Sequence, residues 1–269
     1  MSENSQKRQH SKQVEIPEKR SKYMNVPNDK IRHGNYHQYY EFRPTDSREQ
    51  DIGKLLSEYV CMPTSGRYAE NIHILDIGCN SGKLTHGLQN VFQMTFQSNQ
   101  VNVLGVDLDQ ALVDNATENY GSQFLKFGHA DISAVSCGAG TNQIRAYMDE
   151  KVINRFDFVC CFSVLMYVHL NHGDDGLRCV LEYICSISEV LLLELQSWKK
   201  YRDQVHKLKR EGRGTYEFYD GLQWRGGDGS LENLIWNYVI SRGFSKVCTT
   251  QQKNEFQRDV VVFARNIDE

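Results

Sequence analysis

The sequence predicts an α/β fold with a mostly parallel sheet that helices cover on both faces. Short apolar runs alternate with segments of helical spacing from residue 71 to residue 265. The apolar runs carry hydrophobic residues at consecutive positions, which is typical of strands buried on both faces. Several runs also end in a turn that contains Asp or Gly, at the edge where α/β sheets bind their ligands.

The first half of this pattern contains three strands and two helices. The run NIHILDIG ends in a turn, and Leu84, Leu88 and Phe92 then follow at helical spacing. The expected elements are a strand at 71–78, a helix at 82–93, a strand at 101–109, a helix at 110–120 and a strand with a loop at 122–132.

The second half contributes four more strands, which gives seven in all. The run FDFVCCFSVLMYV is apolar throughout and is interpreted as one strand. The expected elements are a strand at 156–168, a helix at 174–189, a strand at 189–196, a helix at 230–244 and strands at 245–252 and 256–265.

Length and composition indicate one large domain with an N-terminal tail. The chain has 269 residues, 40% of them hydrophobic, which is enough for a full core. Residues 1–30 are polar, lean basic and show no apolar periodicity, so we expect a disordered tail there and one domain over 31–269. The net charge of −3 excludes a wholly basic nucleic-acid coat, so any contact with RNA must be local.

The sequence predicts neither a membrane segment nor a zinc finger. No apolar run approaches the ~18 residues of a membrane helix, and residues 1–30 lack the apolar centre of a signal peptide. The eight cysteines form no CxxC pair, which favours reduced thiols in the cytoplasm or nucleus.

The turn LDIGCNSGKLT at 75–85 resembles two phosphate-binding loops and fails both patterns. Gly78 and Gly82 are one residue too close for the loop of nucleotide hydrolases, and Leu84 follows Lys83 where a hydroxyl is needed. Asn80 replaces the second glycine of the dinucleotide motif. What remains is an acidic residue, Asp76, before a glycine turn that tolerates positive φ at Asn80, with Lys83 on the exposed side of the next helix.

Two further carboxylates follow at the ends of the next two strands. Asp107 ends the run GVDLD and is placed to accept both hydroxyls of a ribose. Asp131 ends GHADIS, where the amino group of an adenine would lie, although a lone Asp after a strand is more often a helix cap. The ordered set of Asp76, Asp107 and Asp131 matches the pattern of methyltransferases that use S-adenosyl-L-methionine.

Three other segments narrow the class of methyltransferase. They are HGNYHQYYEFRP at 33–44, FSVLMYVHLNHGDDGL at 162–177 and LLLELQSWKKYR at 191–202. Together with LDIGCNSG they resemble the Bicoid-interacting-3 family of RNA 5′-phosphate methyltransferases. The resemblance implies a class I (Rossmann-like) S-adenosylmethionine-dependent fold with a seven-stranded sheet, and S-adenosyl-L-homocysteine as the product.

The family has two branches, and the sequence carries features of both. HLNHGDDGL, WKKYR and WRGGDGSLENLI resemble the branch that methylates 5′-monophosphates of small RNAs such as a tRNA or a microRNA precursor. GNYHQYYEFR and FQRDVVVF are similar to the branch that caps the γ-phosphate of a small nuclear RNA. ELQSW stands where the family has EPQPW. The loss of both prolines would shift the substrate loop and change the substrate specificity. We expect 5′-monophosphate methylation, with γ-phosphate capping as the alternative.

The resemblance also implies which residues bind the methyl donor. Arg48 would reach the methionine carboxylate, which suits the two-pronged guanidinium. The implied donor-binding residues are Tyr40, Arg48, Gly78, Asn80, Asp107, Leu108, Asp131, Ile132 and Phe162, to which the spacing argument adds Asp76.

Methyl transfer to a phosphate oxygen needs positioning more than it needs a base, because the oxygen is already anionic at neutral pH. Hydrogen-bond donors near the strand ends are therefore the candidate catalytic residues: Tyr36, Tyr39, His169, Lys199 and Lys200. The candidate substrate-binding residues are Asn171, His172, Gln196, Trp198, Tyr201 and Arg202. A basic stretch suited to an RNA backbone follows, at His206, Lys207, Lys209, Arg210 and Arg213.

Each of these residues has a structural alternative. The tyrosines can serve as packing anchors, His169 as a buried hydrogen-bonded residue and Asn171 as a turn former. The basic stretch can be a solvated helix face, and Glu194 can simply tie down the loop after its strand. His169 and His172 lie three residues apart, and only Asp174 and Asp175 offer further ligands nearby, so no metal is expected.

The sequence thus predicts a monomeric enzyme in the cytoplasm, and also in the nucleus, whose partner is the 5′ end of a small structured RNA. It predicts no contact with a membrane. Two other classes remain open: an RNA-binding protein that keeps the fold without catalysis, and a methyltransferase for small molecules or proteins.

Overall fold

The computed structural model describes residues 32–34, 48–62, 70–97, 99–139, 143–227, 229–254 and 257–266. The predicted tail at 1–30 and the predicted site residues Tyr36, Tyr39 and Tyr40 lie outside these ranges.

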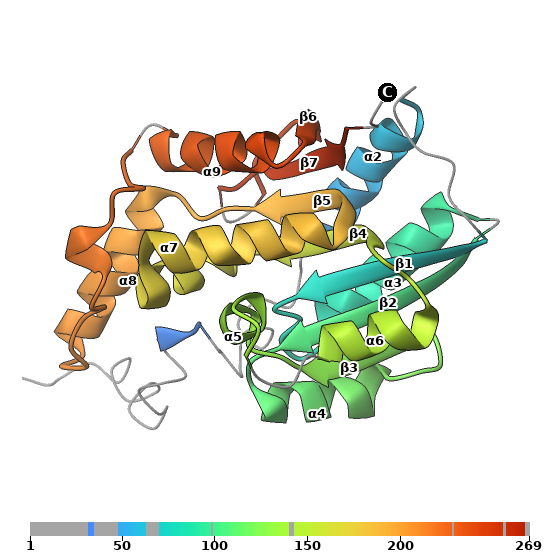
Figure 1. The fold of residues 1–269 in the computed structure, drawn as a ribbon, viewed down its shortest axis with the longest axis horizontal. Coiled ribbons are helices and arrows are strands. Elements are labelled where there is room, and N and C mark those ends of the chain that lie inside the picture. Colours follow the sequence, from blue (N-terminus) through green and yellow to red (C-terminus); the bar gives the residue numbers. More distant parts are fainter. Residues whose placement is uncertain are drawn as a thin grey trace, which may run out of the picture.

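The chain forms one seven-stranded sheet, with strand order β3-β2-β1-β4-β5-β7-β6 (Figure 1). Strands β1 to β5 are parallel to one another, and β7 pairs antiparallel with both β5 and β6. This arrangement confirms the predicted, mostly parallel sheet. The strands are β1 (Asn71–Ile77), β2 (Gln100–Asp107), β3 (Leu125–His129), β4 (Phe156–Phe162), β5 (Ser188–Glu194), β6 (Phe244–Thr249) and β7 (Val260–Arg265).

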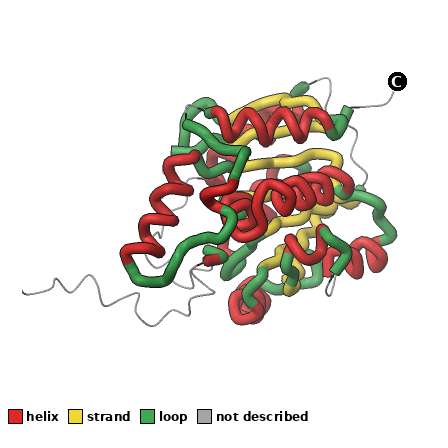
Figure 2. Tube along the Cα trace, turned by 60° about the vertical axis from the view of Figure 1, so that its left-hand side comes forward, coloured by secondary structure: helices red, strands yellow, loops and turns green. Residues whose placement is uncertain are grey.

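Helices cover both faces of the sheet, as the tube view shows (Figure 2). One core cluster joins α2 and α3 to the sheet, and a second joins α5, α6, α7 and α9 to the opposite face. The helices are α2 (Arg48–Val60), α3 (Lys83–Thr95), α4 (Gln110–Tyr120), α5 (Ile132–Ser136), α6 (Gln143–Lys151), α7 (Leu165–Ser186), α8 (Trp198–Arg210) and α9 (Ser230–Ser241). None of the helices in the described part of the chain has the length and apolarity to cross a bilayer.

The apolar strands follow from this double cover. Ile72 and Ile74 of β1 belong to the cluster under α2 and α3, whereas Leu75 and Ile77 belong to the cluster under α6 and α7. Successive side chains of a strand point to opposite faces, so a strand buried on both sides needs apolar residues at adjacent positions. All eight cysteines are free thiols in the structure.

The prediction of one strand over 156–168 is wrong. β4 ends at Phe162, Ser163 has a left-handed backbone (φ 63°), and α7 begins at Leu165. The predicted helix at 174–189 therefore starts nine residues earlier, and its helical backbone is interrupted at Gly173 (φ 69°, ψ −172°). Both the end of the strand and the start of the helix are buried, so an unbroken apolar run does not reveal where one becomes the other.

Candidate active site

The turn after β1 is held by the neighbouring strand. The amides of Gly78 and Cys79 both donate to the carbonyl of Val106 in β2, at 2.8 and 3.0 Å. Gly78 and Gly82 have φ of 81°, and Asn80 has φ of 52°. The structure thus confirms the predicted positive φ at Asn80, and α3 begins directly after the turn, at Lys83.

Two glycines of this turn are needed for space as well as for φ. A Cβ at Gly78 would collide with the side chain of Val164, at the start of α7. A Cβ at Gly82 would lie 2.8 Å from Cβ of Ala116 and 2.9 Å from Cζ of Phe127. The turn therefore packs directly on the segment between β4 and α7, which joins the two halves of the site.

Asp107 organises the loop beside this turn. Its side chain is 7% exposed, and its two oxygens accept from the amides of Asn80 and Asp109, each at 2.9 Å. Burial raises the pKa of Asp107, while the amide hydrogen bonds oppose the rise. Each carboxylate oxygen has more than one acceptor position, so Asp107 retains the capacity to accept from a ligand hydroxyl.

Asp76 lies beneath the turn, in a buried polar cluster. Its Oδ2 accepts from the hydroxyl of Thr85 at 2.6 Å. Burial raises the pKa of Asp76 to about 6, against the lowering effects of Thr85 and of the Arg48 guanidinium, and the nearby Asp107 raises it further. Arg48 is 4% exposed at the start of α2, so the structure brings this predicted residue to the donor loop.

The remaining predicted donor residues lie at the ends of β2, β3 and β4. Asp131 caps α5, since its Oδ1 accepts from the amides of Ser133 and Ala134 at 2.9 and 3.3 Å, as the helix-cap alternative proposed. Ile132 and Phe162 are buried, and Leu108 is half-buried with its carbonyl accepting from Nε2 of His129 at 2.9 Å.

A buried network joins the carboxyl ends of β4 and β5. Glu194 is fully buried and accepts from Arg258 at 3.1 Å, from Nδ2 of Asn254 at 2.5 Å and from the hydroxyl of Ser163. Gln196 donates from Nε2 to the carbonyl of Ser163 at 2.6 Å, and its own Oε1 is buried without a hydrogen-bond partner among the described residues. The structure thus confirms that Glu194 ties down the loop that follows its strand.

A second network holds the middle of α7. His169 is fully buried, donates from Nε2 to Asp174 at 2.9 Å, and has Nδ1 3.2 Å from the hydroxyl of Tyr201. Burial lowers the pKa of His169, so the ring is neutral and Nδ1 accepts from Tyr201. Asp174 also accepts from the amides of Gln223 and Trp224, at 2.8 Å each. The buried, hydrogen-bonded alternative describes the position of His169 in this structure.

Asn171 fastens the N-terminal segment to α7. Its Nδ2 donates to the carbonyl of Arg32 at 3.0 Å, and the hydroxyl of Tyr216 donates to the same carbonyl at 2.9 Å. The guanidinium of Arg32 in turn donates to the carbonyl of Thr215 at 3.0 Å. This clasp fixes residues 32–34, which directly precede the predicted tyrosine segment in the chain.

Helix α8 presents the predicted cations to solvent. Lys199, Lys200 and Arg202 are exposed in its first two turns, whereas Tyr201 is buried against His169. Trp198 stacks on Tyr219, with ring centroids 5.5 Å apart and planes 8° apart. His172 is exposed on α7. In Figure 1, β1 and β2 point toward the side of the molecule on which α8 lies.

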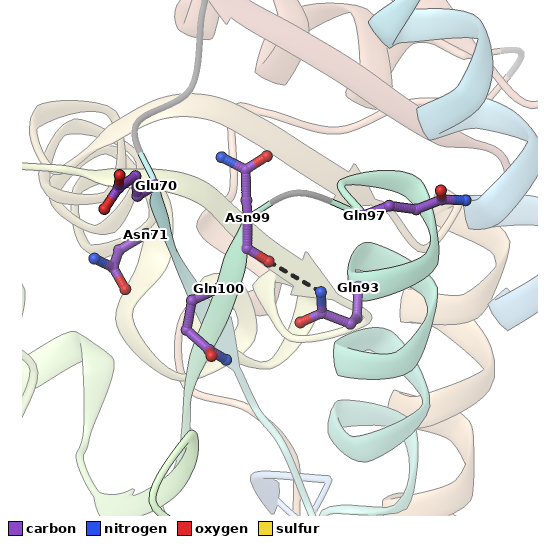
Figure 3. A pocket seen from close by; sticks show the side chains of 6 residues that line it. All are labelled: Glu70, Asn71, Gln93, Gln97, Asn99 and Gln100. Atoms are coloured by element: carbon purple, nitrogen blue, oxygen red, sulfur yellow. Dashed lines mark hydrogen bonds between the residues drawn. The ribbon is translucent and has the colours of Figure 1, made fainter.

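A polar pocket lies at the opposite edge of the sheet (Figure 3). It is lined by Glu70, Asn71, Gln93, Gln97, Asn99 and Gln100, at the start of β1 and β2. In open α/β sheets ligands bind at the carboxyl ends of strands, so this pocket is distinct from the donor site. Among the described residues, no group of three or more His, Cys, Asp and Glu side chains is arranged to hold a metal ion.

Comparisons with known proteins identify the family. The family model described as Bicoid-interacting protein 3 (Bin3) matches residues 156–265. A pre-miRNA 5′-monophosphate methyltransferase of Danio rerio is 36% identical over 201 residues, which cover 72% of this chain and 78% of that protein. The chain belongs to the Bin3 family. An RNA 5′-monophosphate methyltransferase of Rattus norvegicus is 32% identical over 203 residues, which cover 72% of this chain and 70% of that protein.

Solved structures confirm the class I methyltransferase fold of this Bin3 family member. The N-methyltransferase NodS of Bradyrhizobium japonicum, in complex with S-adenosyl-L-homocysteine, superposes with a TM-score of 0.54. The match covers 90% of this chain and 98% of NodS, at 13% identity.

The donor side of the Bin3 site fits S-adenosyl-L-methionine. Asp107 keeps free acceptor capacity for ribose hydroxyls, and the buried charge of Arg48 suits a carboxylate. Asp76 and Asp131 would be the acceptors for the ammonium and amino groups at the two ends of the donor.

The sequence reasoning missed several residues that the structure places in the Bin3 site. Ser163, Asn254, Arg258, Arg32 and Tyr216 all join segments that are far apart in the chain. Arg258 lies in the segment FQRDVVVF, which resembles the capping branch, but no role was assigned to this arginine from the sequence. Ser163 likewise lies in the segment at 162–177 and was given no role, whereas Tyr216 lies in none of the segments that were singled out.

Proposed function

We propose that this Bin3 family member transfers a methyl group from S-adenosyl-L-methionine to the 5′-phosphate of RNA, with a 5′-monophosphate as the preferred end. One observation carries the proposal. The donor turn at Gly78 packs on Val164, and the adjacent Ser163 is hydrogen-bonded to Gln196, two residues before α8. A donor loop is therefore continuous with a segment rich in cationic hydrogen-bond donors. The names of the Danio rerio and Rattus norvegicus relatives support the phosphate as acceptor.

The donor supplies a methyl group on a positively charged sulfur, and the chain supplies orientation. The phosphate oxygen is already anionic, so no residue has to remove a proton from it. Lys199, Lys200 and Arg202 are exposed at the start of α8, where their side chains can meet the phosphate. Their positive charge offsets the repulsion between a dianionic phosphate and the carboxylates of the donor loop.

His169 and Tyr201 act as positioning residues in this proposal. Both are buried, and they connect α7 to α8 through the hydrogen bond between Nδ1 and the tyrosine hydroxyl. That bond sets the position of α8, and with it the direction of the neighbouring Lys200 and Arg202. Tyr36 and Tyr39 remain predicted catalytic residues, and Tyr40 remains a predicted donor-binding residue.

The exposed face of α8 suits the backbone of a small structured RNA. Lys209 and Arg210 continue the exposed cationic face, with His206 and the acidic Asp203 also exposed among them. Such a face attracts phosphates without reading bases. We propose a monomer as the active form, and the cytoplasm and also the nucleus as its location, on the sequence argument alone.

The test is methyl transfer to one hairpin RNA that carries a 5′-hydroxyl, a 5′-monophosphate or a 5′-triphosphate. Transfer to the monophosphate is the expected result, and preference for the triphosphate would replace it with γ-phosphate capping. Lys199→Ala with Lys200→Ala should raise the KM for RNA and leave the affinity for S-adenosyl-L-homocysteine unchanged. Lys54→Ala, an exposed lysine on α2, is the matched control. Binding of RNA without transfer from a bound donor would leave only the RNA-binding alternative.

A further inference from the structure

Phe218 presents an aromatic ring to solvent above the interruption in α7. The side chain is 43% exposed, although phenylalanine is usually buried. Its other side faces the backbone of Gly173, where an added Cβ would lie 2.9 Å from Cδ1 of the ring. Gly173 has φ of 69° and ψ of −172°, so the helix bends away at the point that the ring covers. One side of the ring is thus supported, and the other is open.

The loop that carries Phe218 is fixed at both sides of the ring. Tyr219 stacks on Trp198 of α8, and Asp174 of α7 binds the amides of Gln223 and Trp224. The hydroxyl of Tyr216 is bound to the carbonyl of Arg32. A ring held this way loses little conformational entropy when a ligand stacks on it.

Charges around the ring are mixed. Burial and the carboxylate of Asp220 raise the pKa of Tyr219, and the guanidinium groups of Arg202 and Arg225 oppose that rise, so charges of both signs act on this side chain. Glu217 and Asp220 are exposed on the same loop. Opposite charges of equal number give little net attraction for phosphate, in contrast to the cationic face of α8. The feature that remains for a ligand is the open face of an aromatic ring.

The ring lies within reach of the first nucleotides of an RNA whose 5′ end is at the donor loop. Val164 packs on Gly78, and Gly173 follows nine residues later in α7. At 1.5 Å per helical residue this separation is about 13 Å. Stacked nucleotides advance about 3.4 Å each, so the distance corresponds to about four nucleotides.

We propose that Phe218 is a stacking platform for one unpaired nucleobase within about four nucleotides of the RNA 5′ end. This inference rests on the proposed function. Every base has a flat π-face, so an aromatic ring binds an unpaired base with little sequence preference. A paired base is stacked within its own helix and does not offer that face. The platform therefore selects RNAs whose 5′ end is not fully paired.

The test compares methyl-transfer kinetics of the wild type, Phe218→Ala and Phe218→Trp on a 5′-monophosphate RNA with four unpaired 5′ nucleotides. Phe218→Ala should raise the KM for RNA about tenfold with kcat unchanged, and Phe218→Trp should restore it. Ile240→Ala is the matched control, since Ile240 is 44% exposed on α9. Thermal unfolding of each variant shows whether the fold is retained.

Abasic substitution at each of the four nucleotides identifies the stacked base. One abasic RNA should raise the KM of the wild type about tenfold and have no effect on that of Phe218→Ala. An unchanged KM for Phe218→Ala, or an equal loss on every abasic RNA, would overturn the platform while leaving the proposed function intact. Failure of the wild type to methylate any RNA end would overturn the proposed function and the platform together.

Discussion

The two halves of the carboxyl edge are built by different means. Around β1, β2 and β3, the donor half relies on backbone conformation, with left-handed residues in one short turn and amides bound by Asp107. Around β4 and β5, the acceptor half relies on side chains, such as the Glu194 network and the pair of His169 and Asp174. The donor half is therefore specified by a short stretch of neighbouring residues. The acceptor half is assembled from side chains that lie far apart in the sequence.

This comparison predicts that removing one side chain lowers the unfolding free energy more in the acceptor half than in the donor half. Glu194→Ala leaves the Arg258 guanidinium, which is 14% exposed, without its carboxylate partner. Removing one member of a buried ion pair costs about 3–5 kcal/mol of unfolding free energy. Urea denaturation measures this loss.

A matched control for that variant is available at the surface. Glu189→Ala removes ion pairs with Arg155 and Arg265 at the surface and should cost less than about 1 kcal/mol. Equal small losses for Glu189→Ala and Glu194→Ala would show that the buried network does not stabilise the acceptor half.

Asp76 predicts a pH dependence that belongs to the donor half. Its pKa is about 6 in the folded chain against the ordinary value of 3.8 for an aspartate carboxyl group, mainly because of burial. Folding therefore favours the protonated form, so the contribution of Asp76 to stability is complete below about pH 4 and is lost as pH rises through about 6.

The size of this effect follows from the difference between these two pKa values. The difference in unfolding free energy between the wild type and Asp76→Asn should change by about 3 kcal/mol between pH 4 and pH 7, to the disadvantage of the wild type. Denaturant titrations across this range provide the measurement. Parallel stability curves for the two proteins would contradict the assignment.

Asp107 tests whether the donor half binds through its prearranged loop. Asp107→Ala removes the acceptor for two amides and for the predicted ribose hydroxyls, and should weaken S-adenosyl-L-homocysteine binding about 100-fold. Calorimetric titration measures the affinity. Asp114→Ala, on the exposed side of α4, should change it less than about twofold. Unchanged affinity in Asp107→Ala would place the donor elsewhere.

Substitution of Gly78 distinguishes two costs in unfolding free energy: backbone strain at positive φ, and a steric clash between the donor half and the acceptor half. Gly78→Ala and Gly138→Ala both place alanine at positive φ, which costs about 1–2 kcal/mol in each case. Only Gly78 has a neighbour, Val164, in the path of the new methyl group, and this adds about 1–3 kcal/mol.

The second variant in this test is Val164→Ala. Combined with Gly78→Ala it should recover part of the extra loss in unfolding free energy, because it removes the colliding methyl groups. Equal losses at Gly78 and Gly138, with no recovery, would mean that the donor turn does not press on the acceptor half.

The sequence by itself determined the sheet and the donor turn. Adjacent apolar residues are required wherever a strand is covered on both faces, and Gly78 and Asn80 mark positions where positive φ is needed. These requirements act within a few residues of one another, so spacing and residue type reveal them. The carboxylates Asp76, Asp107 and Asp131 were found in the same way.

Only the tertiary structure decided how the acceptor half is assembled. The break at Ser163 lies inside an apolar run that suits both a strand and a helix. The burial of His169 and Tyr201 depends on how α7 packs on α8. The bond between Tyr216 and Arg32 joins residues 184 positions apart. Such contacts depend on packing across the whole chain, and no local pattern of residues encodes them.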